Sequence, residues 1–73
     1  MRLRQIFANN LRHWRTERGL SQEALADAAG IDRTYVSALE RQRYSASLDM
    51  IETLAAALDV APTDLLGADR WPE

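Results

Sequence analysis

The sequence contains no cysteine, no lysine and only one histidine. Without cysteine there is no disulfide, thiolate nucleophile or thiolate metal site, which fits a reducing cytoplasm. Long apolar runs and a signal-peptide pattern are also absent, so neither a membrane protein nor a secreted protein is expected. His13 has no serine or carboxylate partner at a meaningful spacing, and the aspartates at 59, 64 and 69 do not form a metal loop. We therefore expect no enzyme, and no cofactor, metal or small-molecule ligand.

The 73 residues suffice for one domain, which we assign to residues 1–73 with a core at about 7–67 and a short tail at 68–73. A core of this size is small, so dimerisation would add to its stability. The net charge of −2 is unevenly distributed. Residues 1–43 hold eight arginines and five acids, whereas residues 44–73 hold one arginine and six acids. The basic part is compatible with nucleic-acid binding and also with ordinary solvated charge.

Apolar residues recur at helical spacing along the chain, and no alternating run predicts a strand. The spacing of Leu3, Phe7, Leu11 and Trp14 predicts a first helix over about 3–18, which Gly19 ends. Ser47 is expected to cap a fourth helix with the apolar stripe Leu48, Ile51, Leu54, Ala55 and Leu58. Pro62 suits the first turn of a fifth helix, which Gly67 ends. The sequence therefore predicts an all-α fold.

Residues 20–44 have the pattern of two short helices joined by a tight turn. Ser21 is a good N-cap for a helix over about 21–29, and Gly30 can adopt the left-handed conformation that ends it. Asp32 can cap the next helix, over about 32–41. Small alanines in the first helix of this pair allow the two helices to approach closely. This is the layout of a helix-turn-helix, whose second helix, the recognition helix, enters the DNA major groove.

These segments resemble the Cro/phage-repressor type of helix-turn-helix regulators, an XRE-like family with a compact domain of five helices. The matching residues are Gly19–Gln22, Leu25–Ala26, Gly30–Ile31, Val36–Ser37, Leu39–Glu40, Ser47–Leu48, Ile51, Leu54–Ala55, Ala57–Leu58 and Leu65–Leu66. They span about residues 7–67. The stretch at 33–49 is also similar to the small controller proteins of restriction–modification systems.

The resemblance implies a cytoplasmic, sequence-specific regulator of transcription that binds duplex DNA as a homodimer on a palindromic operator. The alternative is a protein-interaction module, such as the antitoxin of a toxin–antitoxin pair. In that case the acidic half at 44–73 would meet a basic partner. Whether a regulator of this kind represses or activates depends on where its operator lies.

For base contact, the resemblance indicates five residues of the recognition helix: Arg33, Thr34, Ser37, Ala38 and, near its far end, Arg41. Since Val36 and Leu39 face inward, positions 33, 34, 37 and 41 also fall on the outer arc of the helix. Arg33 can donate twice to a guanine, a contact that discriminates by about 1–3 kcal/mol; the alternative is a solvated or phosphate-bound side chain. Thr34 is expected to touch a thymine methyl or a phosphate, or to serve only as a first-turn residue.

Contacts to the DNA backbone are expected from three places: the start of the preceding helix, the recognition helix itself and the loop after it. The residues are Ser21, Gln22, Tyr35, Arg43, Tyr44 and Ser45. Gln22 lies at the amino end of a helix, where free N–H groups favour a phosphate. The family also uses this position to brace the recognition helix. Tyr35 either places its hydroxyl on a phosphate or has a half-buried ring. The other arginines near the first helix, at 2, 4, 12 and 18, are expected to be solvated.

Two structural roles also follow from the resemblance. Arg15 and Glu40 correspond to an ion pair that orients the recognition helix. Family members of this size pair through the fifth helix and its flanks, which implicates Val60, Leu65, Leu66 and Trp71 in a dimer interface. For Leu65, closing the core of the monomer is the preferred alternative.

Overall fold

The computed structural model of the protein describes residues 2–68, and this range contains five helices and no strand. The helices are α1 (Leu3–Glu17), α2 (Gln22–Ala29), α3 (Arg33–Glu40), α4 (Leu48–Leu58) and α5 (Pro62–Leu66). The all-α prediction is confirmed, and each helix begins and ends within one residue of its expected limits. Among the described residues, no helix combines the length and the apolar character that a membrane span requires.

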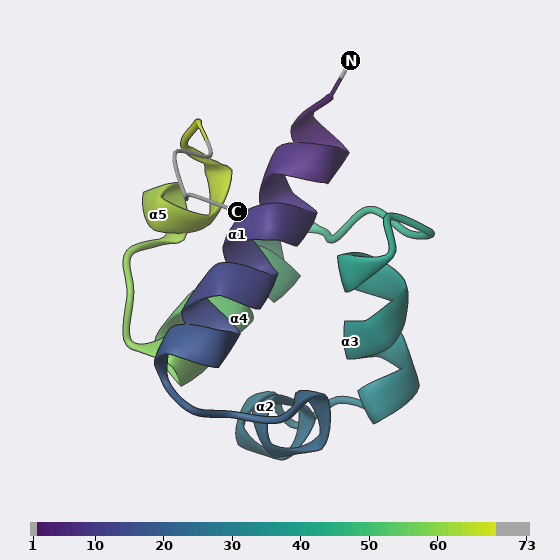
Figure 1. The fold of residues 1–73 in the computed structure, drawn as a ribbon, viewed down its shortest axis with the longest axis vertical. Helices are drawn as coiled ribbons and strands as arrows, with labels where there is room; N and C mark the ends of the chain where they lie inside the picture. Colours follow the sequence, from purple (N-terminus) through teal and green to yellow (C-terminus); the bar gives the residue numbers. More distant parts are fainter. Residues whose placement is uncertain (1, 69–73) are drawn as a thin grey trace.

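The helices enclose one apolar core (Figure 1). α1 runs through the middle of the view with α4 behind it, and α5 and α3 lie on opposite sides of α1. α2 packs against α3 and α4, while α1 packs against α3 and α5. Every described helix contributes at least one side chain to the centre, where the fully buried residues include Leu11, Leu25, Val36, Leu39, Leu54, Leu58 and Leu65. Burying these side chains supplies the main driving force for folding.

Serine side chains begin two of the helices, as the sequence predicts. The Ser21 hydroxyl accepts from the Ala24 amide at 3.0 Å, and the Ser47 hydroxyl accepts from the Met50 amide at 3.0 Å. Asp32 occupies the N-cap position of α3, but its side chain makes no capping hydrogen bond. Each of the two serine caps satisfies one amide that has no partner inside its helix.

A residue in the left-handed region follows each of the first four helices. Two are the expected glycines, Gly19 (φ 70°) and Gly30 (φ 72°), and the other two are Gln42 (φ 64°) and Asp59 (φ 58°). The next amide along the chain then turns back to a carbonyl five residues earlier, as Arg43 does to Ala38 at 2.9 Å. This arrangement satisfies carbonyl groups at the helix ends. At Gln42 and Asp59 it requires a conformation that residues with a Cβ rarely adopt.

Two polar side chains of the α1 segment reach the carboxyl ends of later helices. The buried Asn10 amide donates to the carbonyls of Leu65 at 3.0 Å and Gly67 at 2.8 Å, which fastens the end of α5 to α1. Arg18 is exposed, as expected, but it also has partners that the sequence did not predict. Its Nε donates to the Leu58 carbonyl at 2.8 Å, and its guanidinium lies 5.1 Å from the centre of the Trp14 ring.

Candidate DNA interface

The turn between α2 and α3 positions the recognition helix, α3, at the edge of the molecule (Figure 1). Gly30 ends α2 in the left-handed conformation, and the Ile31 amide donates back to the Ala26 carbonyl at 2.9 Å. Val36 and Leu39 are fully buried against the core. Because one face of a short helix is held inward in this way, the opposite face of α3 points to solvent.

Most residues predicted to contact bases lie on this outward face. Arg33, Thr34 and Arg41 are exposed, and Ser37 is half-buried between them. Positions 33, 37 and 41 are spaced by four residues, so they follow one line along the helix surface. The arrangement offers two guanidinium groups with a small hydroxyl between them, and guanidinium groups match the acceptor atoms of a guanine edge or a phosphate.

Ala38, which the resemblance also assigned to base contact, does not belong to this exposed set. Its side chain is only 6% exposed. The chain reverses at Gln42, and the Arg43 amide donates to the Ala38 carbonyl, which brings the following loop back against this turn of α3. Ala38 therefore presents little surface to DNA, and its contact with a base stays a prediction.

Glu40, at the end of α3, is bound by donors from two other helices. It is only 3% exposed. Arg15 donates to it twice, from Nε to Oε2 at 2.6 Å and from a terminal nitrogen to Oε1 at 3.1 Å. The Gln22 Nε2 donates to Oε1 at 3.1 Å, and Arg12 Nε lies 3.7 Å from the same oxygen. The ion pair that the resemblance implied is therefore present. Together with the bond from Gln22, this pair joins α1, α2 and α3 and sets the orientation of the recognition helix.

Ser21 and Gln22 lie where α2 begins, beside this network. The Ser21 hydroxyl is engaged in capping α2, and Gln22 braces Glu40. An amide nitrogen of glutamine carries two donor hydrogens, so one bond to Glu40 leaves a second for a phosphate. Gln22 therefore braces the recognition helix, as the family resemblance implied, and its contact with a phosphate stays a prediction.

The loop at 41–46 continues the basic surface beyond α3. Arg43 is exposed, and Tyr44 is 60% exposed. The Tyr35 ring is half-buried against the core and lies 6.4 Å from the Tyr44 ring. The Ser45 hydroxyl accepts a hydrogen bond from Arg4 Nε at 3.0 Å, so Arg4 has a partner that the sequence did not predict.

Exposed arginines gather on α3 and in the loop after it. The exposed arginines at 33, 41 and 43 lie on α3 and in the following loop. The exposed acids of the other half lie on α4, in the connector after it and on α5, at positions 49, 52, 59 and 64. Exposed acids also lie at positions 17, 23, 27 and 32, so the separation is incomplete. Within residues 33–46 the exposed charges are the three arginines alone, which gives this segment a local excess of positive charge.

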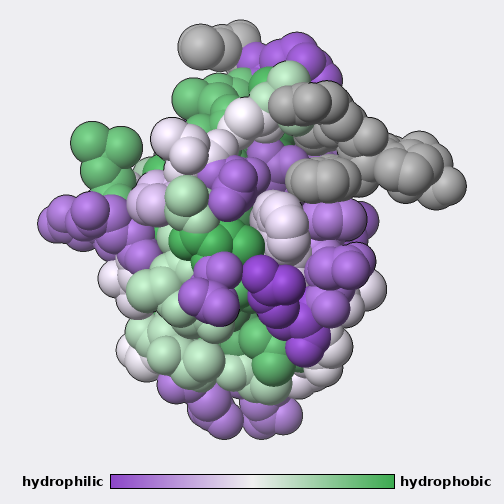
Figure 2. Space-filling model, turned by 90° about the vertical axis from the view of Figure 1, so that its left-hand side faces the viewer, coloured by the Kyte–Doolittle hydropathy of each residue, from purple (hydrophilic) through white to green (hydrophobic). Residues whose placement is uncertain are grey.

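Three of the predicted dimer residues, Val60, Leu65 and Leu66, lie in α5 or just before it, on the side of the molecule that Figure 2 shows. Hydrophobic side chains form an interrupted band on this face, between hydrophilic margins. Val60 and Leu66 are half-buried there and retain exposed surface. Leu65 is 0% exposed, so it closes the core of the monomer and is not available to a partner. Trp71 lies outside the described residues. No group of side chains suited to holding a metal ion occurs within residues 2–68.

Comparisons with curated proteins identify relatives across most of the chain. Residues 11–65 match the helix-turn-helix family. A hypothetical transcription factor of Neisseria meningitidis is 53% identical over 64 residues, which are 88% of this chain and 60% of the relative. The control protein C.SmaI of Serratia marcescens is 38% identical over 66 residues, which are 90% of this chain and 79% of the relative.

Solved structures extend the similarity to three dimensions. The crystal structure of the Neisseria transcription factor superposes with a TM-score of 0.90 at 50% identity, over 93% of this chain and 78% of that one. The restriction–modification controller protein C.AhdI of Aeromonas hydrophila superposes with a TM-score of 0.79 at 49% identity, over 81% of this chain and 86% of that one. By its sequence and its fold, the protein therefore belongs to the XRE-like helix-turn-helix family of DNA-binding transcription regulators.

Proposed function

We propose that the protein is a homodimeric, sequence-specific regulator of transcription that binds a palindromic operator in duplex DNA. The observation that carries this proposal is the row formed by Arg33, Ser37 and Arg41 on the outward face of α3. The network around Glu40 holds that row in one orientation. An orientation that is set before binding lets side chains meet base edges without a further loss of conformational freedom.

We assign base readout to Arg33 of this row and to its exposed neighbour Thr34, which both lie in the first turn of α3. Arg43 and Tyr44 in the following loop, together with Gln22, are assigned to phosphates. Phosphate contacts set the register of the protein on DNA, whereas base contacts choose the sequence. The two groups of residues are therefore expected to respond differently to mutation.

The homodimer follows from the small footprint of one recognition helix. Two copies related by a two-fold axis would place two such helices about one helical turn of DNA, roughly 34 Å, apart. The half-buried Val60 and Leu66 are the described residues that we assign to the interface. Because α1–α5 share one core, we also propose that residues 1–73 act as a single DNA-binding unit.

A more specific role is that of a restriction–modification controller protein. The curated relatives include the control proteins C.SmaI and C.BamHI, and a solved structure with similar fold is that of C.AhdI. The chain spans only 60% of the length of the Neisseria transcription factor. A restriction endonuclease and a methyltransferase encoded beside the gene, with the selected operator upstream of them, would support the controller role.

In vitro selection from a randomised pool of duplex DNA, at near-physiological salt, tests the proposal. We expect enrichment of a palindrome with half-sites about one turn apart. Sedimentation of the protein with the selected duplex should then give two protein chains per duplex. A folded protein that enriches no sequence would contradict the proposal and favour a protein-interaction role, such as that of an antitoxin. Co-purification of a small basic protein would identify that partner.

A further inference from the structure

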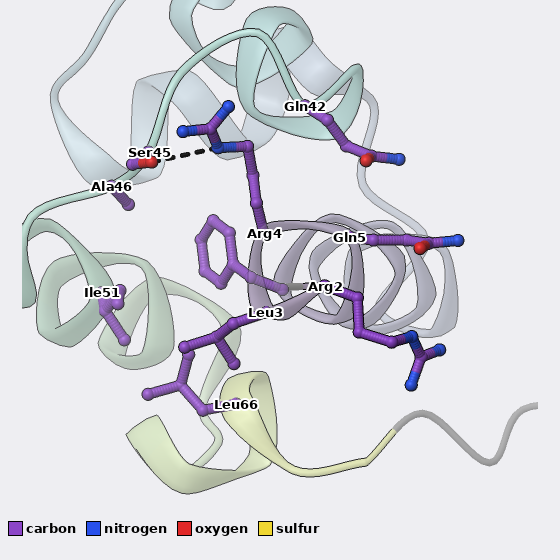
Figure 3. Close-up of a pocket in the computed structure, with 10 residues that line it drawn as sticks. Arg2, Leu3, Arg4, Gln5, Gln42, Ser45, Ala46, Ile51 and Leu66 are labelled. Atoms are coloured by element: carbon purple, nitrogen blue, oxygen red, sulfur yellow. Dashed lines mark hydrogen bonds between the residues drawn. The ribbon is translucent and has the colours of Figure 1, made fainter.

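A hollow of about 890 Å³ lies between the first turns of α1, the loop after α3, α4 and α5 (Figure 3). Its floor is apolar and includes Phe7 and Ile51. The side of its rim nearest the loop is formed by Arg4 and Ser45, whereas Arg2, the residue before α1, points away from the loop. No acidic residue is among those that line the hollow. The rim thus brings the positive charge of Arg4 beside the basic loop at 41–46.

Arg4 and Ser45 are joined across this rim although 41 positions separate them in the sequence. The Nε of Arg4 donates to the Ser45 Oγ at 3.0 Å. A hydroxyl that accepts in this way keeps its own proton, which can be donated to another acceptor. The two terminal nitrogens of Arg4 extend away from the floor of the hollow (Figure 3). Among the described residues, no carboxylate lies within ion-pair distance of this guanidinium.

We infer that Arg4 and Ser45 together bind one phosphodiester group of the DNA backbone, at a site next to the recognition helix. This inference rests on the proposed function. The guanidinium supplies a planar fork of N–H donors, which matches two oxygens of a phosphate. The Ser45 hydroxyl supplies a further donor, made stronger because it already accepts a hydrogen bond from a cation.

The position of the pair also favours a phosphate over a base. Ser45 follows two residues after Arg43, so the site continues the basic surface of the loop away from the outward face of α3. Arg4 belongs to α1, and its bond to Ser45 ties the loop to that helix. The first turn of α1 contains no acidic residue that would repel an anion. The phosphate would therefore bridge two segments that are far apart in the chain.

A scan with methylphosphonate duplexes tests this site at the level of single phosphates. Each duplex carries the selected operator with one phosphate per half-site replaced by an uncharged methylphosphonate. Dissociation constants are measured for the wild-type protein, for R4Q and S45A, and for R2Q. The R2Q variant is the matched control, because it removes the same charge from the same end of α1 without touching Ser45. Thermal melting of each variant establishes that the fold is intact.

We expect R4Q to weaken binding to the unmodified operator by roughly three- to tenfold and to lower the salt slope by about one per subunit. R4Q should also lose the wild-type sensitivity to methylphosphonate at one phosphate per half-site, and S45A should lose part of it at the same phosphate. R4K should keep the salt slope without restoring full affinity, because an ammonium lacks the fork. R2Q should leave the profile of sensitive phosphates unchanged.

Two results would overturn the inference. A wild-type methylphosphonate profile in R4Q would mean that Arg4 contacts no particular phosphate. Equal losses of affinity in R4Q and R2Q, again with unchanged profiles, would reduce Arg4 to a long-range charge. In both cases the wild-type protein still binds its operator, so the proposed function stands. A wild-type protein that binds no duplex refutes the proposed function and this site together.

Discussion

Replacing Arg15 by methionine is expected to destabilise the protein strongly, because it leaves the buried Glu40 carboxylate without its main partner. Arg15 is 16% exposed in its side chain and Glu40 2%, and the two share two hydrogen bonds. Removing one partner of a buried pair costs about 3–5 kcal/mol. Gln22 still donates to Glu40, and Arg12 lies near it. We therefore expect a loss at the low end of that range, about 3 kcal/mol.

The same substitution at Arg12 is the matched control. Arg12 lies on the same helix and 3.7 Å from the same carboxylate, but its side chain is 59% exposed. Exposed ion pairs contribute about 0–1 kcal/mol, so R12M should change the free energy of unfolding by less than about 1 kcal/mol. The contrast between the two variants isolates burial from charge, since each removes one guanidinium near Glu40.

Urea denaturation followed by circular dichroism, at one fixed protein concentration, measures both variants. For a domain of this size a loss of 3 kcal/mol corresponds to a fall in Tm of roughly 12–24 °C. The double variant R15M/E40L should recover part of the loss, because it removes the buried charge together with its partner. Equal costs for R15M and R12M, or a cost of under about 1 kcal/mol for R15M, would refute the assignment of this pair as the support of α3.

Five further substitutions test the interface and the fold. R33A should relax the base preference at one position per half-site in repeated selection, whereas R43A should weaken all sequences similarly and lower the salt slope by about one per subunit. The opposite pattern would exchange the two assignments. L66E should give a weakly binding monomer in sedimentation, and an unchanged dimer would place the interface elsewhere. N10A should cost about 1–3 kcal/mol in urea denaturation, because it leaves two carbonyls at the end of α5 without their donor; a neutral effect would mean that these carbonyls find other partners. G30A should cost about 1–2 kcal/mol through its positive φ alone, since a Cβ there would meet nothing within 4 Å.

The limits of the helices were predictable because local chemistry decides them. Ser21 and Ser47 cap helices through bonds to amides three residues away. Gly30 is suited to its left-handed turn whatever surrounds it. The outward positions of Arg33 and Thr34 also follow from helical periodicity, once Val36 and Leu39 are recognised as buried. The left-handed Gln42 carries no such signal, because a residue with a Cβ adopts that conformation only when its surroundings impose it.

What only the tertiary structure decided is which distant groups each side chain meets. Arg18 and Arg4 are alike in sequence as basic residues of the α1 segment, yet one binds carbonyls at the end of α4 and the other binds Ser45. Leu65 satisfies the pattern of an interface residue, but the packing of α1 and α4 against α5 buries it completely. Periodicity by itself determined the helices and the exposed face of α3, since both depend on neighbours within one or two turns. Burial and long-range hydrogen bonds depend on how all five helices close around one core, and a local pattern does not contain that information.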